Sequence, residues 1–166
     1  MAPSVYISPP ERPERMYQRD RQVLPDFEGG ESLYLRYGCQ DFLDGQLLSS
    51  AIRFPKTSVN RGSLSEPEDV LFDENGMYKG LGVVEFKVSD LPPRVAQDQG
   101  PAYSFFMKHV PVSNNYSHSE IWSDQESMTG QYKEPSKTVK TKFRIQLCQR
   151  ISLAQIRIEA VRNRAN

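Results

Sequence analysis

Two histidines and one glutamate are the residues of this 166-residue chain that best fit catalytic chemistry. His109 and His118 are its two histidines, and Glu120 follows the second of them closely. One imidazole can take up a proton while another gives one up, as in metal-free cleavage of RNA. The candidate catalytic residues are therefore His109, His118 and Glu120, with Lys108 or Arg61 stabilising the phosphate.

The same side chains could instead bind a metal, since zinc accepts two imidazoles and a carboxylate. However, the spacing of the histidines matches no standard metal motif, and Cys39 and Cys148 lack zinc-binding spacing. We therefore predict no metal site and no cofactor. The alternative to catalysis is a pair of hydrogen-bonded histidines near a turn.

The two histidines flank a polar turn between two segments that have the pattern of β-strands. The first segment carries aromatic and β-branched side chains, and Ser113-Asn114-Asn115 is typical of a turn. In the second segment, alternation with Ile121 in the core puts His118, Glu120 and Trp122 on the opposite face. We therefore expect a hairpin in which His118 lies beside Glu120.

Further strands and one helix are predicted along the rest of the chain. Apolar patterns predict strands over 32–38, 46–55 and 80–91, and the first two are candidates for a hairpin. For the Gly- and Pro-free C-terminus we predict a helix over about 137–150 and a strand over about 151–161, with two strands as the alternative. The fold class is therefore α+β, with an antiparallel or mixed β-sheet, one C-terminal helix and long loops.

The first 26 residues contain five prolines and little apolar periodicity. Such a segment favours neither a helix nor a central strand. We therefore predict an arm over 1–26 that is disordered or ordered by a partner, followed by a single globular domain over 27–166. Because neither a membrane span nor a secretory signal is recognisable, we expect a cytoplasmic protein without membrane contact.

Charge is distributed unevenly, although 21 basic and 21 acidic residues balance overall. Residues 27–132 hold 15 acids and eight bases, whereas residues 133–166 hold nine bases and two acids. A basic segment of this kind either pairs with the acidic body of its own fold or docks on nucleic acid or on an acidic partner. The candidate nucleic-acid-binding residues of this segment are Lys137, Lys140 and Arg144.

Arg61 is a further candidate for nucleic-acid binding, because it is the only base between Lys56 and Lys79. Its guanidinium could clamp a phosphate with two hydrogen bonds. The alternative is a structural ion pair with one of the acids that follow it, namely Glu66, Glu68 or Asp69.

Three functions fit these patterns, in the following order. The first is a non-catalytic subunit or adaptor of an intracellular complex, which binds a protein partner through its loops, arm and basic C-terminal segment. The second is a nucleic-acid-binding protein, and the third is a small RNase-like hydrolase that uses His109 and His118. The order favours a protein that is not an enzyme.

Overall fold

The computed structural model describes residues 11–73, 75, 82–126, 132–151 and 156–157. Its strands are β1 Ser32–Tyr37, β2 Phe42–Leu43, β3 Gln46–Leu47, β4 Thr57–Arg61, β5 Gly82–Lys87, β6 Arg94–Val95, β7 Tyr103–His109, β8 His118–Gln125 and β9 Ile156–Arg157. The α-helix α1 spans Lys137–Ile151, and short 3₁₀ turns are η1 Glu14–Met16, η2 Cys39–Asp41, η3 Ser49–Ala51, η4 Pro67–Leu71 and η5 Val88–Asp90.

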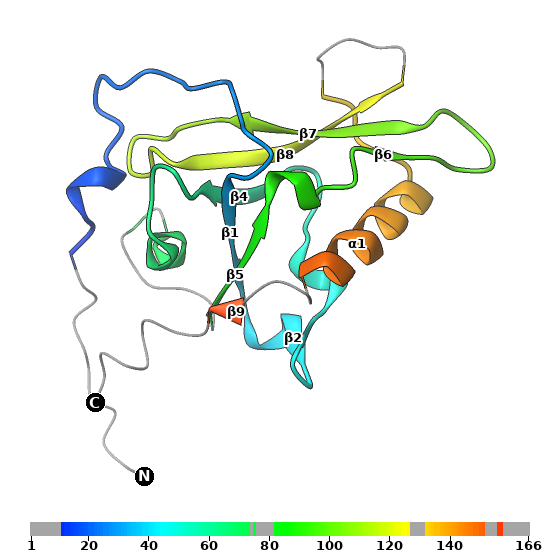
Figure 1. Ribbon diagram of the computed structural model, residues 1–166, viewed down its shortest axis with the longest axis horizontal. Helices are drawn as coiled ribbons and strands as arrows, with labels where there is room; N and C mark the ends of the chain where they lie inside the picture. Colours follow the sequence, from blue (N-terminus) through cyan, green and yellow to red (C-terminus); the bar gives the residue numbers. More distant parts are fainter. Residues whose placement is uncertain (1–10, 74, 76–81, 127–131, 152–155, 158–166) are drawn as a thin grey trace.

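Seven strands form one sheet in the order β6-β7-β8-β4-β1-β5-β9, and the pairings between them are antiparallel. α1 lies on one side of this sheet, near β5 and β6 (Figure 1). The predicted α+β class with one helix near the C-terminus is confirmed for the described residues. None of their helices has the length and apolar character needed to cross a bilayer.

One face of the sheet is covered by α1 and forms the hydrophobic core. Phe143 of α1 stacks on Phe105 of β7 with ring centroids 4.0 Å apart. Both rings also contact the edge of Phe54, which lies in the segment before β4. The helix buries one stripe at helical spacing, and the members of that stripe are Val139, Phe143, Leu147, Cys148 and Ile151. We call this side of the sheet the core face.

The predicted hairpin between 33–37 and 47–54 is wrong, because the start of the second segment pairs with residues just before it in the chain instead. β3 ends at Leu47 and pairs with β2 in a separate two-stranded sheet, while β1 pairs with β4 and β5. The buried carboxylate of Asp41 accepts hydrogen bonds from the Gly38 N–H and the Ser50 hydroxyl, at 3.0 and 2.9 Å. These bonds stabilise the compact local turn, and the longer strand over 46–55 does not form.

The predicted helix over 137–150 is confirmed by α1, while the strand predicted next is described in part. The Ser136 hydroxyl caps the helix by accepting from the Val139 N–H at 3.3 Å. β9 lies within the predicted strand over 151–161 and pairs with β5. Residues 152–155 and 158–161 of that prediction lie outside the described residues.

Residues 11–26, which the sequence predicts to be disordered or ordered by a partner, lie along the body of the protein. Met16 is buried, and its carbonyl accepts from the Tyr116 N–H at 2.7 Å. The Arg15 guanidinium makes two 2.7 Å hydrogen bonds to the buried carboxylate of Asp69. The proline-rich segment forms no sheet ladder, but the body itself supplies partners for its polar groups. Residues 1–10 lie outside the described residues.

Replacing Phe143 with Ala should lower the free energy of unfolding by about 3–5 kcal/mol, because the ring is fully buried against Phe105. Ile145 on the same helix is 49% exposed, so Ile145→Ala is the matched control, with an expected change below about 0.5 kcal/mol. Chemical denaturation of the two variants measures both values. Equal losses would contradict the described orientation of α1.

Candidate functional site

The His109 ring lies on the core face, where it connects two backbone segments. Its Nδ1 accepts a hydrogen bond from the Leu24 N–H at 2.8 Å, so the proton is on Nε2, which donates to the Tyr116 carbonyl at 2.6 Å. The residue is only 5% exposed, and this burial lowers the pKa of His109. His109 is therefore a neutral ring with both nitrogens occupied by the backbone.

His118 begins β8 and points away from the core face. Its Nδ1 donates to the Val110 carbonyl at 2.7 Å, and its Nε2 is hydrogen-bonded to the Ser58 hydroxyl at 3.2 Å. The predicted alternation around the buried Ile121 is confirmed. Glu120 shares the face of His118, but it accepts instead from the Trp122 indole N–H at 3.2 Å.

His109 and His118 lie on opposite faces of the sheet. His109 is the register partner of Ser119, so the side chain of the neighbouring His118 projects from the other side. Joint acid–base catalysis requires both groups to reach one substrate. The candidate catalytic set of His109, His118 and Glu120 therefore loses its geometric basis. Within the described residues, no three His, Cys, Asp or Glu side chains are grouped to hold a metal ion.

The side chain of Arg61, which the sequence predicts to clamp a phosphate, is buried and hydrogen-bonded within the protein. Its guanidinium donates to the carbonyls of Leu24 and Asp26 and to the carboxylate of Glu31, the last at 3.1 Å. The Phe27 ring packs against it with 3.8 Å between Cζ and the ring centroid. Only 5% of the side chain is exposed, which leaves no surface for a phosphate.

Three predicted nucleic-acid contacts, Lys137, Lys140 and Arg144, follow one side of α1 at helical spacing. Arg144 donates to the Ile52 carbonyl at 2.8 Å. Its guanidinium and the Lys140 ammonium lie 5.0 and 5.6 Å from the centroid of Phe54. The structure thus brings this helical stripe to the segment before β4. Its role in nucleic-acid binding stays a prediction.

The face of the sheet opposite the core face carries polar and aromatic side chains on β7, β8, β4 and β1. Cross-strand pairing puts Lys108 beside Glu120, Phe106 beside Trp122 and Asn60 beside Tyr34. We call this surface the polar face. Its residues are Tyr34, Arg36, Ser58, Asn60, Phe106, Lys108, His118, Glu120 and Trp122.

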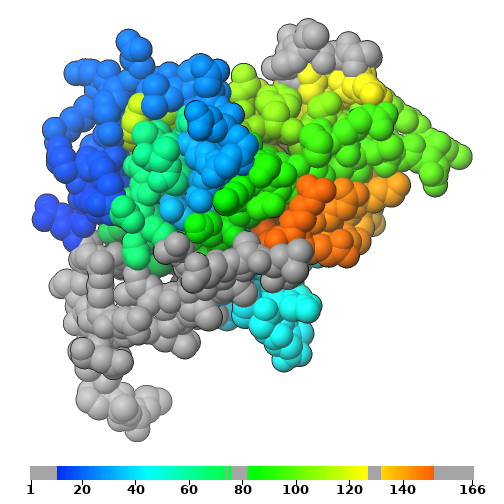
Figure 2. Space-filling view, in the orientation of Figure 1, coloured from blue at the N-terminus to red at the C-terminus, as the bar shows by residue number. Residues whose placement is uncertain are grey.

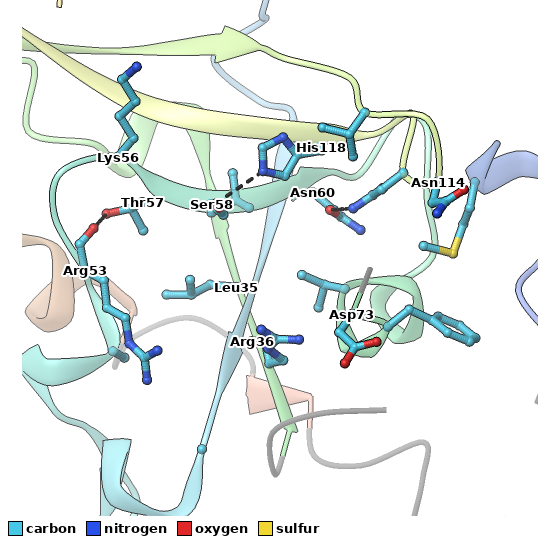
Figure 3. A pocket seen from close by; sticks show the side chains of 18 of the residues that line it. Leu35, Arg36, Arg53, Lys56, Thr57, Ser58, Asn60, Asp73, Asn114 and His118 are labelled. Carbon is cyan, nitrogen blue, oxygen red and sulfur yellow. Dashed lines mark hydrogen bonds between the residues drawn. The ribbon is translucent and has the colours of Figure 1, made fainter. Parts of the chain in front are cut away.

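A groove of about 1060 Å³ opens on the polar face (Figure 3). Its acidic lining residues are Asp41 and Asp73, and Asp41 already lies 3.7 Å from one of the arginines that line the groove. Cationic side chains outnumber these acids and come from three separate segments of the chain. They are Arg12 from the N-terminal segment, Arg36 from β1, and Arg53 and Lys56 from the segment before β4.

Two buried N–H donors of groove-lining residues have no hydrogen-bond partner among the described residues. Asn60 is 1% exposed; its Oδ1 accepts from the Asn115 side chain at 2.8 Å, which leaves its Nδ2 unpartnered. Arg12 donates to the Asp73 carbonyl, but its Nε has no acceptor. A buried unsatisfied donor costs about 1–3 kcal/mol. Both atoms are enclosed by protein, so this cost belongs to the folded state itself.

Comparison with protein-family models, curated proteins and solved structures finds no match to this chain. Sequence patterns also missed the groove cations. Alternation could have found Arg36, which lies between Leu35 and Tyr37 of β1 and faces away from the core. Arg12, Arg53 and Lys56 lie outside strands, and only the tertiary fold brings them together.

Acidification should destabilise the protein partly through His109. Because burial lowers the folded pKa of His109 below the ordinary 6.5, the unfolded chain binds the proton more readily. The stabilising effect is complete above this ordinary value and is lost as pH falls from about 6.5 through the folded pKa. Thermal unfolding of His109→Gln should show a smaller loss of midpoint between neutral and mildly acidic pH than the wild type. Equal losses in His109→Gln and the wild type would contradict this account.

Proposed function

We propose that this protein is a non-catalytic nucleic-acid-binding protein whose ligand lies in the groove on the polar face. The observation that carries the proposal is the convergence of cationic side chains from three chain segments, namely Arg12, Arg36, Arg53 and Lys56. Lysine and arginine bind the phosphate backbone and release condensed counterions.

The basic stripe of α1 extends this cationic surface. Arg53 precedes Phe54 in the chain, and Lys56 follows two positions later. Lys140 and Arg144 lie over the Phe54 ring from the helix side. A nucleic acid that leaves the groove past Arg53 would therefore meet further cations on α1 rather than the acidic remainder of the body.

A binding role without catalysis also agrees with the state of the histidines. His109 uses both ring nitrogens for backbone hydrogen bonds, and His118 uses both for Val110 and Ser58. Neither ring has a nitrogen left to exchange a proton with a ligand unless an existing hydrogen bond breaks. We therefore do not propose the RNase-like activity.

The double variant Arg53→Gln/Lys56→Gln should bind single-stranded DNA or RNA more weakly than the wild type. Each lost phosphate contact should reduce the slope of log affinity against log salt by about 0.7, hence by about 1.4 for the pair. Fluorescence anisotropy across a salt series measures both quantities. A triple Lys137→Gln/Lys140→Gln/Arg144→Gln variant tests the helical stripe in the same way.

The matched control is Lys87→Gln/Arg94→Gln, which removes two cations that do not line the groove. Arg94 resembles Arg53 in being exposed and paired with a carboxylate, that of Glu126 at 3.0 Å. The control should keep the wild-type affinity and slope. Equal weakening in both double variants would show that net charge, and not the groove, determines binding. No binding of the wild type at low salt would remove the proposed function.

A second candidate function, a subunit or adaptor that binds a protein partner, is favoured by the hairpin of β2 and β3. Leu43 is 60% exposed near its turn and Leu48 is 37% exposed just after it. Figure 2 shows this segment, in cyan, standing out from the body of the protein. These two leucines are the exposed apolar side chains that a protein partner would cover on this hairpin.

If the hairpin binds a partner, Leu43→Ser/Leu48→Ser should lose a protein that the tagged wild type retains from native lysate. Both side chains are exposed, so the thermal midpoint should change little. Ile145→Ser, which changes an apolar side chain on α1 whose 49% exposure lies between those of the two leucines, is the control and should retain the partner. The same partner on all three proteins would exclude the hairpin as its binding surface.

A further inference from the structure

We infer that Trp122 is a base-stacking platform and that the nucleic acid bound on the polar face is single-stranded. This inference rests on the function proposed above and adds the class of ligand. Trp122 is the single tryptophan of the chain and lies on β8, half-buried, on the same face as the groove. Phe106, its register partner on β7, is also half-buried on that face.

The indole is held in place through its N–H and has cations over its ring. Its N–H donates to Glu120 at 3.2 Å, and the Tyr132 ring meets it edge-on, with centroids 6.0 Å apart. The ammonium of Lys56 lies 4.5 Å from the Trp122 centroid, and that of Lys108 lies at 5.4 Å. The indole N–H is thus held by the protein, and two ammonium groups over the ring can meet the phosphates of a nucleotide whose base stacks there.

Lys56 connects the indole to the groove. Its ammonium lies over both aromatic rings, 4.5 Å from the Trp122 centroid and 4.8 Å from that of Tyr132, while the same residue lines the groove. A phosphate that draws the ammonium away would uncover part of the indole for the adjoining base. The groove cations and the platform can therefore act on consecutive nucleotides of one strand.

Stacking on Trp122 requires an unpaired base. In a duplex, each base is stacked between its neighbours and paired at its edge, so an aromatic side chain fixed on a sheet cannot reach its face. On a single strand, the face of any base is available, and stacking on an aromatic side chain tolerates every base. A duplex should therefore bind only through its phosphates.

The alternative role for Trp122 is a surface contact with Lys56 that contributes only to folding. Such a cation–π contact would respond to phosphates as well as to bases, because phosphates alone can withdraw the lysine. A stacking platform responds specifically to the presence of bases. The test must therefore compare strands that have the same backbone and differ in their bases.

The experiment records the fluorescence of Trp122, which reports on this site alone because the chain holds no other tryptophan. The wild type is titrated at low salt with a short oligothymidylate, with an abasic strand of the same length and with the corresponding duplex. Anisotropy of the labelled strands measures binding in parallel. We expect all three to bind, but only the oligothymidylate to quench the indole strongly. Equal quenching by the abasic strand, or binding of the oligothymidylate without quenching, would overturn the inference.

Variants give a second readout. Trp122→Leu should weaken binding of the oligothymidylate roughly 5- to 100-fold, since stacking is lost, while its salt dependence and its binding of the abasic strand stay unchanged. Trp122→Phe keeps an aromatic face and should recover most of the affinity. Equal affinities of the Leu variant and the wild type would contradict the inference and leave the proposed function intact. If no probe binds the wild type at all, the proposed function itself fails. The quenching experiment needs no variant, so a Leu variant that does not fold cannot prevent the test.

Discussion

The buried guanidinium of Arg61 sets the arrangement of the polypeptide around it. A charge removed from water must be surrounded by acceptors, and Arg61 finds them in the carbonyls of Leu24 and Asp26 and in the carboxylate of Glu31. These groups precede β1, whereas Arg61 ends β4, so the ion pair fixes the N-terminal segment across the central strands. The adjoining Leu24 N–H then becomes the partner of His109. Arg61 and His109, whose residue types suggest ligand binding or catalysis, thus stabilise the fold.

The two faces of the sheet carry polar side chains with different roles. The core face carries the structural polar groups, Arg61 and His109, together with the apolar side chains packed under α1. On the polar face Lys108 is exposed and Phe106 and Trp122 are half-buried, whereas Tyr34 is buried, and the N-terminal segment adds Arg12 to the wall of the groove. Chemistry available to a ligand is therefore concentrated on the polar face, although both faces contain residues of similar type.

Sequence patterns predict the local elements and miss the long-range contacts. The helical spacing of Val139, Phe143 and Leu147 was sufficient to predict α1, because a single stripe of apolar side chains at this spacing indicates a helix with one buried side. The alternation of apolar side chains also indicates that the two histidines lie on opposite faces of the sheet. His109 falls on the same side of its strand as the apolar Phe105 and Met107. The partners of Arg61 could not be inferred, because 30 or more positions separate it from Glu31 and Leu24. The groove depends on the same tertiary contacts, so its cations carry no local signal apart from the alternation of Arg36.

The most direct test of ligand binding on the polar face is a ¹H–¹⁵N correlation spectrum of the labelled protein with and without a single-stranded oligonucleotide. The account predicts the largest shifts at the Trp122 indole N–H, the Asn60 side-chain amide and the backbone amide of Ser58. Signals of the core face, such as the amides of Phe143 and Leu147, should move little. Shifts confined to the β2–β3 hairpin or to the core face, with the Trp122 and Asn60 signals unchanged, would contradict the central claim.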